Sequence, residues 1–92
     1  MTINYLESYN RSFKKLDRAI QEKTISVIDV LIEFLRTRQK PEGLGLKKAY
    51  KNYWEIRLDI RNRIIFELVS DSINIAFVGD HNAIRVFLKG VN

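Results

Sequence analysis

Residues 53–67, YWEIRLDIRNRIIFE, combine a strand-like pattern with a row of arginines. Apolar and polar residues alternate from Trp54 to Arg61, and a period of two is typical of a half-buried strand. Arg57 falls on the polar face of this strand, and Arg63 opens the next apolar run. Arginine keeps its charge in proteins and can hold two phosphate oxygens at once. The pattern therefore favours an arginine-lined sheet face that binds an anion.

The chain contains one histidine, His81, and no cysteine. Histidine is the side chain type that ordinarily changes charge near neutral pH, so His81 is a candidate acid or base, with a surface loop histidine as the alternative. Without cysteine there are no disulfides or thiolate metal sites. A single histidine outside any HxxxH motif or carboxylate cluster does not favour a transition-metal site either. We expect acid–base or electrostatic chemistry with no metal and no cofactor.

The charge balance points to an anionic partner. Sixteen Lys and Arg residues face 11 Asp and Glu residues, a net charge of +5. Nucleic acid, a ribosomal surface or an acidic protein segment would suit this excess, and a merely basic protein is the alternative. Residues 46–53 add three lysines among aromatic residues, a pattern that can grip an RNA backbone and stack its bases. A solvated loop anchored in the core by its tyrosines would have the same sequence.

The length and the hydropathy pattern indicate the class of protein. Ninety-two residues predict one domain, residues 1–92. The N-terminal residues MTINYLES lack the basic and apolar regions of a signal peptide. No apolar run approaches the roughly 18 residues of a membrane span. We expect a soluble cytoplasmic protein that does not enter a membrane.

The first 40 residues predict one strand and two helices. A short β-prone stretch, residues 2–6, comes first, and an amphipathic helix begins near Ser8. A second helix is predicted for residues 24–37, with a break near residues 21–24 where the two apolar faces fall out of alignment. One long helix is the alternative.

A loop around Pro41 separates the helices from the C-terminal half. Three strands are predicted there, joined by links short enough for antiparallel hairpins: residues 53–59, 63–69 and 73–79. The tail, residues 82–89, predicts a helical turn, with a short edge strand as the alternative. The order β-α-α-β-β-β indicates an α+β fold. In this fold the N-terminal strand and helical pair pack on one face of an antiparallel sheet, and the other face stays partly open.

The C-terminal half resembles the RelE/ParE superfamily of bacterial toxin–antitoxin toxins. The resemblance lies in four short motifs: LKK at 46–48, YWEIRL at 53–58, NRIIFE at 62–67, and FVGDH at 77–81 followed by Phe87. Their order and spacing cover roughly half of the chain, and the predicted βαα order before them agrees with the family.

The resemblance implies a toxin that a cognate antitoxin neutralises, with any oligomer formed mainly through the antitoxin. Many members cut mRNA on the ribosome without a metal, whereas ParE-like members poison DNA gyrase. We expect a ribosome-dependent mRNA endoribonuclease, because His81 supplies a titrating group that a gyrase poison does not need. Leu44 and Phe87 stand where some members have a glutamate and a tyrosine. An inactive RelE-like binding domain is therefore a further alternative.

Metal-free RNA cleavage needs a base for the 2′-hydroxyl, cations for the phosphorane and an acid for the leaving 5′-oxygen. The resemblance assigns charge stabilisation to Arg57 and Arg63, and proton transfer to His81. Solvated strand arginines paired with nearby carboxylates are the alternative. Glu55 is either the base or an ion-pair partner of Arg57, and the ion pair is the preferred interpretation. Further candidate contacts to nucleic acid are Lys47, Lys48, Lys51, Tyr53, Arg61, Arg85 and Phe87.

The second predicted helix has an apolar stripe that one sheet face cannot cover completely. Three residues widen the stripe: Val27, Val30 and Phe34. Together with the net charge of +5, this predicts a partner segment that docks over the helix pair or the open sheet face.

Overall fold

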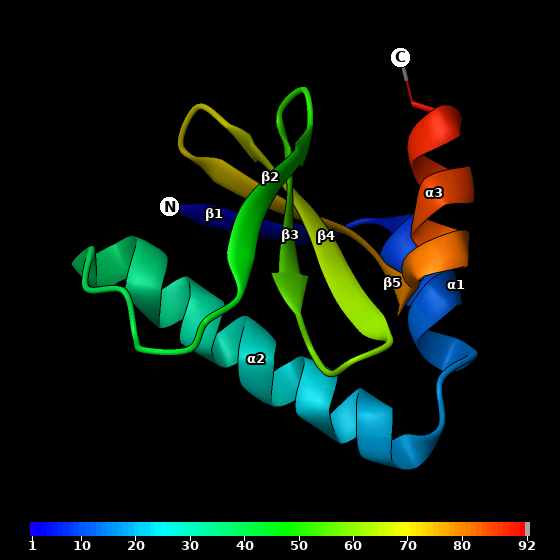
Figure 1. The fold of residues 1–92 in the computed structure, drawn as a ribbon. Coiled ribbons are helices and arrows are strands. Elements are labelled where there is room, and N and C mark those ends of the chain that lie inside the picture. The colour runs from blue at the N-terminus through cyan, green and yellow to red at the C-terminus, as the bar shows by residue number, and fades with distance from the viewer. Residues whose placement is uncertain (92) are drawn as a thin grey trace.

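The computed structural model describes residues 1–91, which form a five-stranded sheet and three helices (Figure 1). The elements in chain order are β1 (Thr2–Tyr5), α1 (Glu7–Lys14), α2 (Arg18–Thr37), β2 (Leu46–Tyr50), β3 (Tyr53–Arg57), β4 (Asn62–Val69), β5 (Ser72–Asp80) and α3 (His81–Lys89). The predicted α+β fold is confirmed. The structure adds β2 to the predicted order, and the predicted C-terminal helical turn is the full helix α3.

The sheet has the strand order β1-β5-β4-β3-β2. Strands β2 to β5 are antiparallel neighbours joined by short turns, whereas β1 pairs with β5 in parallel. The register places Arg57 of β3 opposite Arg63 of β4, and Arg63 opposite Gly79 of β5. The pairing of strands next to each other in sequence thus brings the two arginines together.

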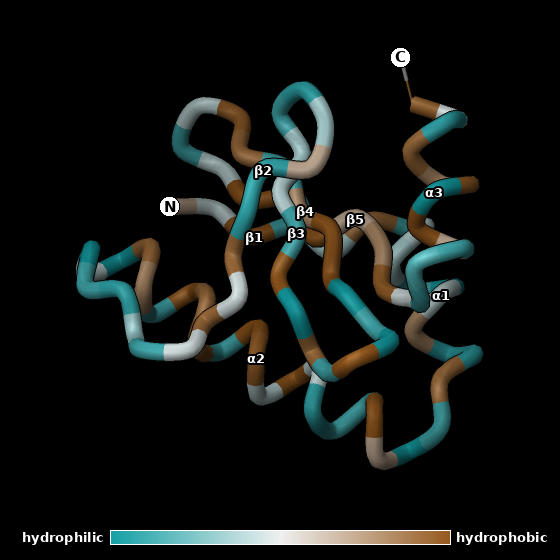
Figure 2. The backbone as a smooth tube through the Cα atoms, in the orientation of Figure 1, coloured by the Kyte–Doolittle hydropathy of each residue, from teal (hydrophilic) through white to brown (hydrophobic). Residues whose placement is uncertain are grey.

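The main core lies between α2 and one face of the sheet. Ile28 and Leu31 of α2 are buried in one cluster with side chains of the sheet such as Ile56, Ile64 and Phe66. Figure 2 shows apolar stretches both in α2 and in the strands that it crosses. Burying an aliphatic side chain of this size contributes roughly 1.5–3 kcal/mol relative to an exposed position. This face is therefore closed, and its side chains are committed to folding.

The break between α1 and α2 falls at residues 15–17, not at the predicted 21–24. The cause is Asp17, whose carboxylate accepts the backbone N–H of Ile20 at 3.0 Å and caps α2. The cap satisfies a donor that the first helical turn would otherwise leave unpaired. The apolar spacing of the first predicted helix therefore continues past the end of α1 at Lys14, and only the Asp17 cap marks the boundary.

Two strand boundaries also differ from the prediction. The basic stretch expected to be a loop contains β2, so its side chains alternate between the two faces of the sheet. The strand predicted to reach Asp59 ends at Arg57. Asp59 accepts the backbone N–H groups of Arg61 (2.8 Å) and Asn62 (2.7 Å), and these bonds form the turn into β4.

Helices α1 and α3 lie side by side at one end of the sheet (Figure 1). Helix α1 continues the sheet edge beyond β1, because the Ser8 hydroxyl donates to the Ala76 carbonyl and Val78 N–H donates to the Ser12 hydroxyl. Helix α3 covers a smaller apolar cluster around Ile65. The face opposite α2 is thus closed near β5 and stays open over β2, β3 and the start of β4. None of the helices in residues 1–91 is long and apolar enough to cross a membrane.

Candidate nucleic-acid interface

Arg57 and Arg63 lie directly opposite each other across β3 and β4. Their strand neighbours Ile56 and Ile64 are buried beneath α2, so alternation places both arginines on the other, open face. Directly opposed residues have Cβ atoms about 4.5–5.5 Å apart, and like charges in this arrangement destabilise a sheet. The two cations repel each other across the strands, whereas an anion placed between them would be bound from two sides.

Arg63 is held in one orientation by three contacts. Its Nε lies 3.3 Å from a carboxylate oxygen of Glu55, and its Nη1 donates to the carbonyls of Asp59 (3.0 Å) and Asn62 (3.3 Å). The side chain is only 20% exposed. A guanidinium fixed in this way is preorganised for an anion on the open face.

Glu55 forms ion pairs with Arg63 and Lys47, and the predicted pair with Arg57 is wrong. The Lys47 Nζ lies 3.9 Å from the carboxylate, and the two residues are direct cross-strand neighbours. Arg57 is two positions along the same strand, about 7 Å away at the backbone. Arg63 approaches instead as the diagonal neighbour on β4.

Arg57 is exposed, and no carboxylate within residues 1–91 lies within ion-pairing distance of it. Its backbone N–H donates to the carbonyl of Gly45 at 3.1 Å, which fastens the loop before β2 to the end of β3. Arg61 is likewise exposed, in the turn between β3 and β4. Within residues 1–91, two guanidinium groups without an ion-pair partner, Arg57 and Arg61, therefore accompany the preorganised Arg63.

Helix α3 forms the other wall of the open face. His81 is its first residue and is exposed, and Arg85 and Lys89 follow at intervals of four on the same side of the helix. Arg85 and Lys89 line a cavity of about 380 Å³ together with Ala49 and Tyr50 of β2. This side of α3 therefore faces β2. The basic groove is defined here as the space between β2–β4 and this side of α3.

Lys89 was not predicted as a site residue. Its spacing of four from Arg85 indicates that both lie on the same side of a helix. The short link before Arg63 was predicted and is confirmed, but its role in holding Arg63 through the carbonyl of Asp59 was not predicted. No pattern in the sequence shows that the carbonyl groups of a turn will fix an arginine.

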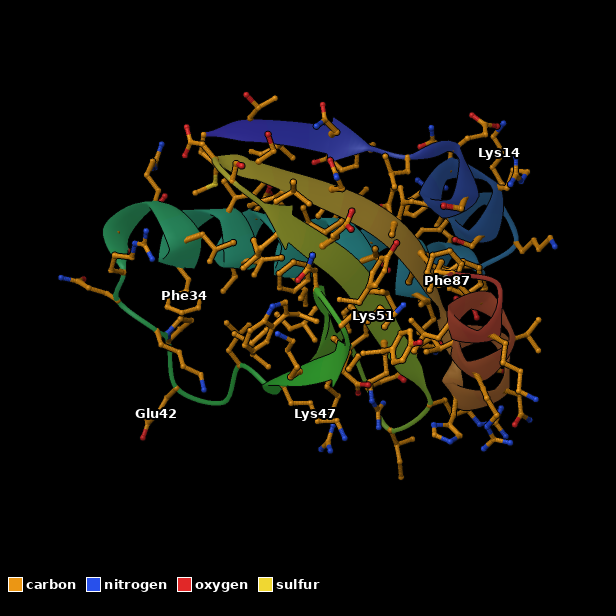
Figure 3. The ribbon with its side chains drawn as sticks, turned by 90° about the horizontal axis from the view of Figure 1, so that it is seen from above. Lys14, Phe34, Glu42, Lys47, Lys51 and Phe87 are labelled. Carbon is orange, nitrogen blue, oxygen red and sulfur yellow. The ribbon has the colours of Figure 1, made fainter. Side chains whose placement is uncertain are left out.

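Tyr53 and Phe87 lie in an aromatic cluster under α3. Phe87 stacks on Phe77 with ring centroids 4.8 Å apart, and Tyr53 meets it edge-on at 6.1 Å. Burial, followed by the nearby charge of Glu67, raises the pKa of Tyr53. Figure 3 shows Phe87 on the side of α3 next to the sheet. The structure therefore places these two candidates where they support the position of α3.

Lys48 and Lys51 are not brought to the basic groove. Lys48 places its Nζ 5.0 Å from the ring centroid of Trp54, which packs against the α2 core on the opposite face from Lys47. Lys51 lies in the β2–β3 turn, with its Nζ 5.3 Å from the Tyr50 ring centroid. Figure 3 shows Lys47 pointing away from β2 at the near edge of the sheet, well apart from Lys51. Of the lysines predicted from the sequence, Lys47 alone joins the arginines.

A second concavity lies outside the basic groove, between α1, β5 and α3. Its volume is about 550 Å³. Its walls are largely apolar, with Arg11 and Lys15 of α1 also lining it, and its outer wall includes Val86, which is 71% exposed. Within residues 1–91, no group of three or more His, Asp or Glu side chains is arranged to hold a metal ion.

The chain matches no protein-family model and no curated protein. Solved structures do match it. A chain of the RelB–RelE antitoxin–toxin complex from Methanococcus jannaschii superposes with a TM-score of 0.70 and 21% identity, over 91% of this chain and 96% of that one. A chain of the RelE–RelB complex from Pyrococcus horikoshii OT3 gives 0.66 and 15%, over 86% and 92%. The YoeB/ParE toxin from Agrobacterium tumefaciens gives 0.63 and 18%, over 88% and 99%.

These similarities extend over 86–91% of this chain and 92–99% of the matched chains. At such identities they show the fold. The predicted α+β fold is thereby confirmed by comparison, because the chain shares its fold with the matched RelE and YoeB/ParE toxin structures.

Proposed function

We propose that this chain is a single-domain toxin of a toxin–antitoxin module, and that it cleaves mRNA on the ribosome in the cytoplasm without a metal. The observation that carries the proposal is the opposed pair Arg57 and Arg63 on the open sheet face, close to the start of the helix that begins with His81. The fold shared with RelE and YoeB/ParE toxins supports it.

The reaction follows from the arrangement of these groups. A base takes the proton of a 2′-hydroxyl, the 2′-oxygen attacks the adjacent phosphorus, and the 5′-oxygen leaves with a proton. Arg63, held by Glu55 and the Asp59–Asn62 turn, and the exposed Arg57 opposite it are the donors for the charge that develops on the phosphorane. His81 carries the proton transfer, because it is exposed at the start of α3 and Phe87 has no proton to give. The expected products are one RNA fragment that ends in a 2′,3′-cyclic phosphate and one that begins with a 5′-hydroxyl.

The basic groove supports RNA as the substrate. Cations line both of its walls, with Lys47, Arg57 and Arg63 on the strands and Arg85 on α3. Each cation that neutralises a backbone phosphate releases a counterion, so binding to this groove should weaken steeply with salt. The ribosome would then supply the message in a fixed orientation, which the small open groove does not do by itself.

A cognate antitoxin is the proposed protein partner. Two of the matched structures are antitoxin–toxin complexes. The predicted apolar stripe on α2 is incompletely covered within residues 1–91, because Val30 is 41% exposed and Ile25, five residues earlier in the same helix, is 53% exposed. An antitoxin segment laid over α2 would cover these side chains, and any larger assembly would form mainly through the antitoxin.

Two alternatives have specific support. A gyrase poison is suggested by the match to a YoeB/ParE toxin. A binding domain without activity is suggested by Glu55 and Phe87, since the one is ion-paired and the other is packed under α3.

Induction of the protein alone, followed by mapping of mRNA 5′ ends, separates the three. We expect growth arrest and new 5′-hydroxyl ends in phase with the reading frame, and no such ends with Arg57→Ala. Broken DNA with intact messages would move the assignment to gyrase. Normal growth with a folded, abundant protein would assign a binding domain.

A further inference from the structure

The Arg63 guanidinium has two edges that can bind an anion, and each of them already contacts an oxygen of the protein. Nη1 donates to two carbonyls of the Asp59–Asn62 turn, at 3.0 and 3.3 Å. The edge formed by Nε and Nη2 is the one that can still take two oxygens of a phosphate. Nε on that edge lies 3.3 Å from the Glu55 carboxylate.

The Glu55 carboxylate lies where a bound anion would lie. It sits between Arg63 and Lys47, on the same face as Arg57, and its side chain is only 16% exposed. A carboxylate offers two acceptor oxygens in a plane, as a phosphate offers two of its oxygens to arginine. The cations that surround Glu55 are therefore those of a phosphate site, and its carboxylate stands in for the phosphate.

We propose that Glu55 occupies an RNA phosphate site formed by the Nε–Nη2 edge of Arg63 and by Lys47, and that the phosphate binds by displacing the Glu55 carboxylate. The inference rests on the proposed function only for the identity of the anion as an RNA phosphodiester. Glu55 then holds the two cations in place before RNA arrives and competes with RNA for them. The unliganded groove is less cationic than its side chains suggest, which limits binding to RNA away from the ribosome.

This exchange predicts a gain of affinity when Glu55 is neutralised. Glu55→Gln keeps the size of the side chain and removes the competing charge, and Glu55→Ala empties the position. Each should bind a single-stranded oligonucleotide about tenfold more tightly, the order expected for one charged hydrogen bond.

Matched controls are present on the same sheet. Glu67→Gln removes a carboxylate from the neighbouring strand, where Glu67 accepts a bond from Asn74 at 3.1 Å, and it should leave affinity unchanged. Lys47→Ala should weaken binding of the oligonucleotide by the wild type. In the Glu55→Gln variant it should cancel most of the gain in affinity. Lys48→Ala should do neither, because Lys48 packs over Trp54 on the opposite face.

The test is fluorescence anisotropy with a 12-nucleotide single-stranded DNA, alongside the Arg63 Nε–H resonance in a ¹H–¹⁵N NMR titration of the same protein. DNA has the phosphodiesters but no 2′-hydroxyl, so the probe is not cleaved and the result does not depend on toxin activity. Tighter binding by both Glu55 variants, with the Arg63 resonance moving on titration, supports the exchange. Equal or weaker binding by variants with unchanged unfolding midpoints overturns it and makes Glu55 a structural partner of Arg63. Failure of the wild type to cut mRNA on ribosomes would contradict the proposed function and leave this result standing.

Discussion

Gly45 lies against Arg57, and a Cβ atom at Gly45 would come 3.0 Å from the Cβ of Arg57. The same residues share the hydrogen bond from Arg57 N–H to the Gly45 carbonyl, at 3.1 Å. The loop that enters β2 thus approaches β3 as closely as a residue without a side chain allows. The position of the exposed Arg57 guanidinium depends on this approach.

Gly45→Ala is predicted to displace Arg57 and to reduce cleavage more than stability. A misplacement of about 1 Å near a reacting group can cost roughly 10²-fold in rate. We expect a loss of that order in single-turnover cleavage, with an unfolding midpoint close to that of the wild type. Full activity in Gly45→Ala would show that Arg57 does not need its present position.

Gly79→Ala provides the contrasting case, because Gly79 is buried and lies opposite Arg63. An added Cβ would come 3.1 Å from the Phe77 ring and 3.2 Å from the Ala83 Cβ, inside the packing under α3. Overpacking of this kind typically costs about 1–3 kcal/mol. Urea unfolding should show such a loss of stability. An unchanged unfolding midpoint would mean that α3 moves to accommodate the added methyl group without cost.

Acid should loosen the turn that presents Arg63. The backbone N–H of Asn62 lowers the pKa of Asp59 below its usual range, partial burial opposes the shift, and the N–H of Arg61 adds to it. A pKa that is lower in the folded than in the unfolded state stabilises the fold above the unfolded value, about 3.9, and the gain disappears as pH falls through the folded value. The free energy of unfolding should therefore decrease as the pH drops below about 4. In Asp59→Asn the contribution of this carboxylate to that decrease should be absent.

Urea unfolding from pH 2 to pH 7 measures this difference. Asp71→Asn is the control, because Asp71 is a largely exposed turn carboxylate that pairs with the N-terminal amine. If the free energy of unfolding depends on pH in the same way in the wild type and in Asp59→Asn, the carboxylate of Asp59 does not contribute to acid sensitivity.

Phe87→Ala is predicted to act through the fold and not through loss of a base-stacking ring. Phe87 stacks on Phe77 and meets Tyr53 edge-on, so truncation opens the cluster under α3. Large-to-small changes of buried Phe cost about 3–5 kcal/mol, and roughly half of that is expected for this partly exposed ring. Val86→Ala, one residue away and 71% exposed, should change stability by less than about 0.5 kcal/mol. Unchanged stability of Phe87→Ala together with weaker RNA binding would restore the base-stacking interpretation.

The hairpins after residue 53 could be predicted because each strand alternates apolar and polar residues and each link is short. Their pairing alone brings Arg57 opposite Arg63. The helix break was misplaced because the apolar spacing continues past Asp17, whose effect is a single hydrogen bond. β2 was missed because lysine is a weak strand former and the stretch shows little alternation.

The partner of Glu55 could not be predicted, for a physical reason. Sequence spacing shows that Glu55 and Arg57 share a face, but contact across strands depends on register and on side-chain rotamers. The diagonal approach of Arg63 replaces the expected pairing, and in the described part of the chain Arg57 has no carboxylate partner.

Single-turnover cleavage of mRNA on programmed ribosomes tests the central claim most directly, when ribosome affinity is measured on the same variants. Arg57→Ala and Arg63→Ala should each lose about 10²–10³ in rate, and His81→Ala about 10²–10⁴, with little change in affinity. Lys48→Ala, on the opposite face, should cut like the wild type. If wild-type protein leaves the message intact, or if His81→Ala and both arginine variants cut as fast as the wild type, the groove is a binding surface and the claim is contradicted.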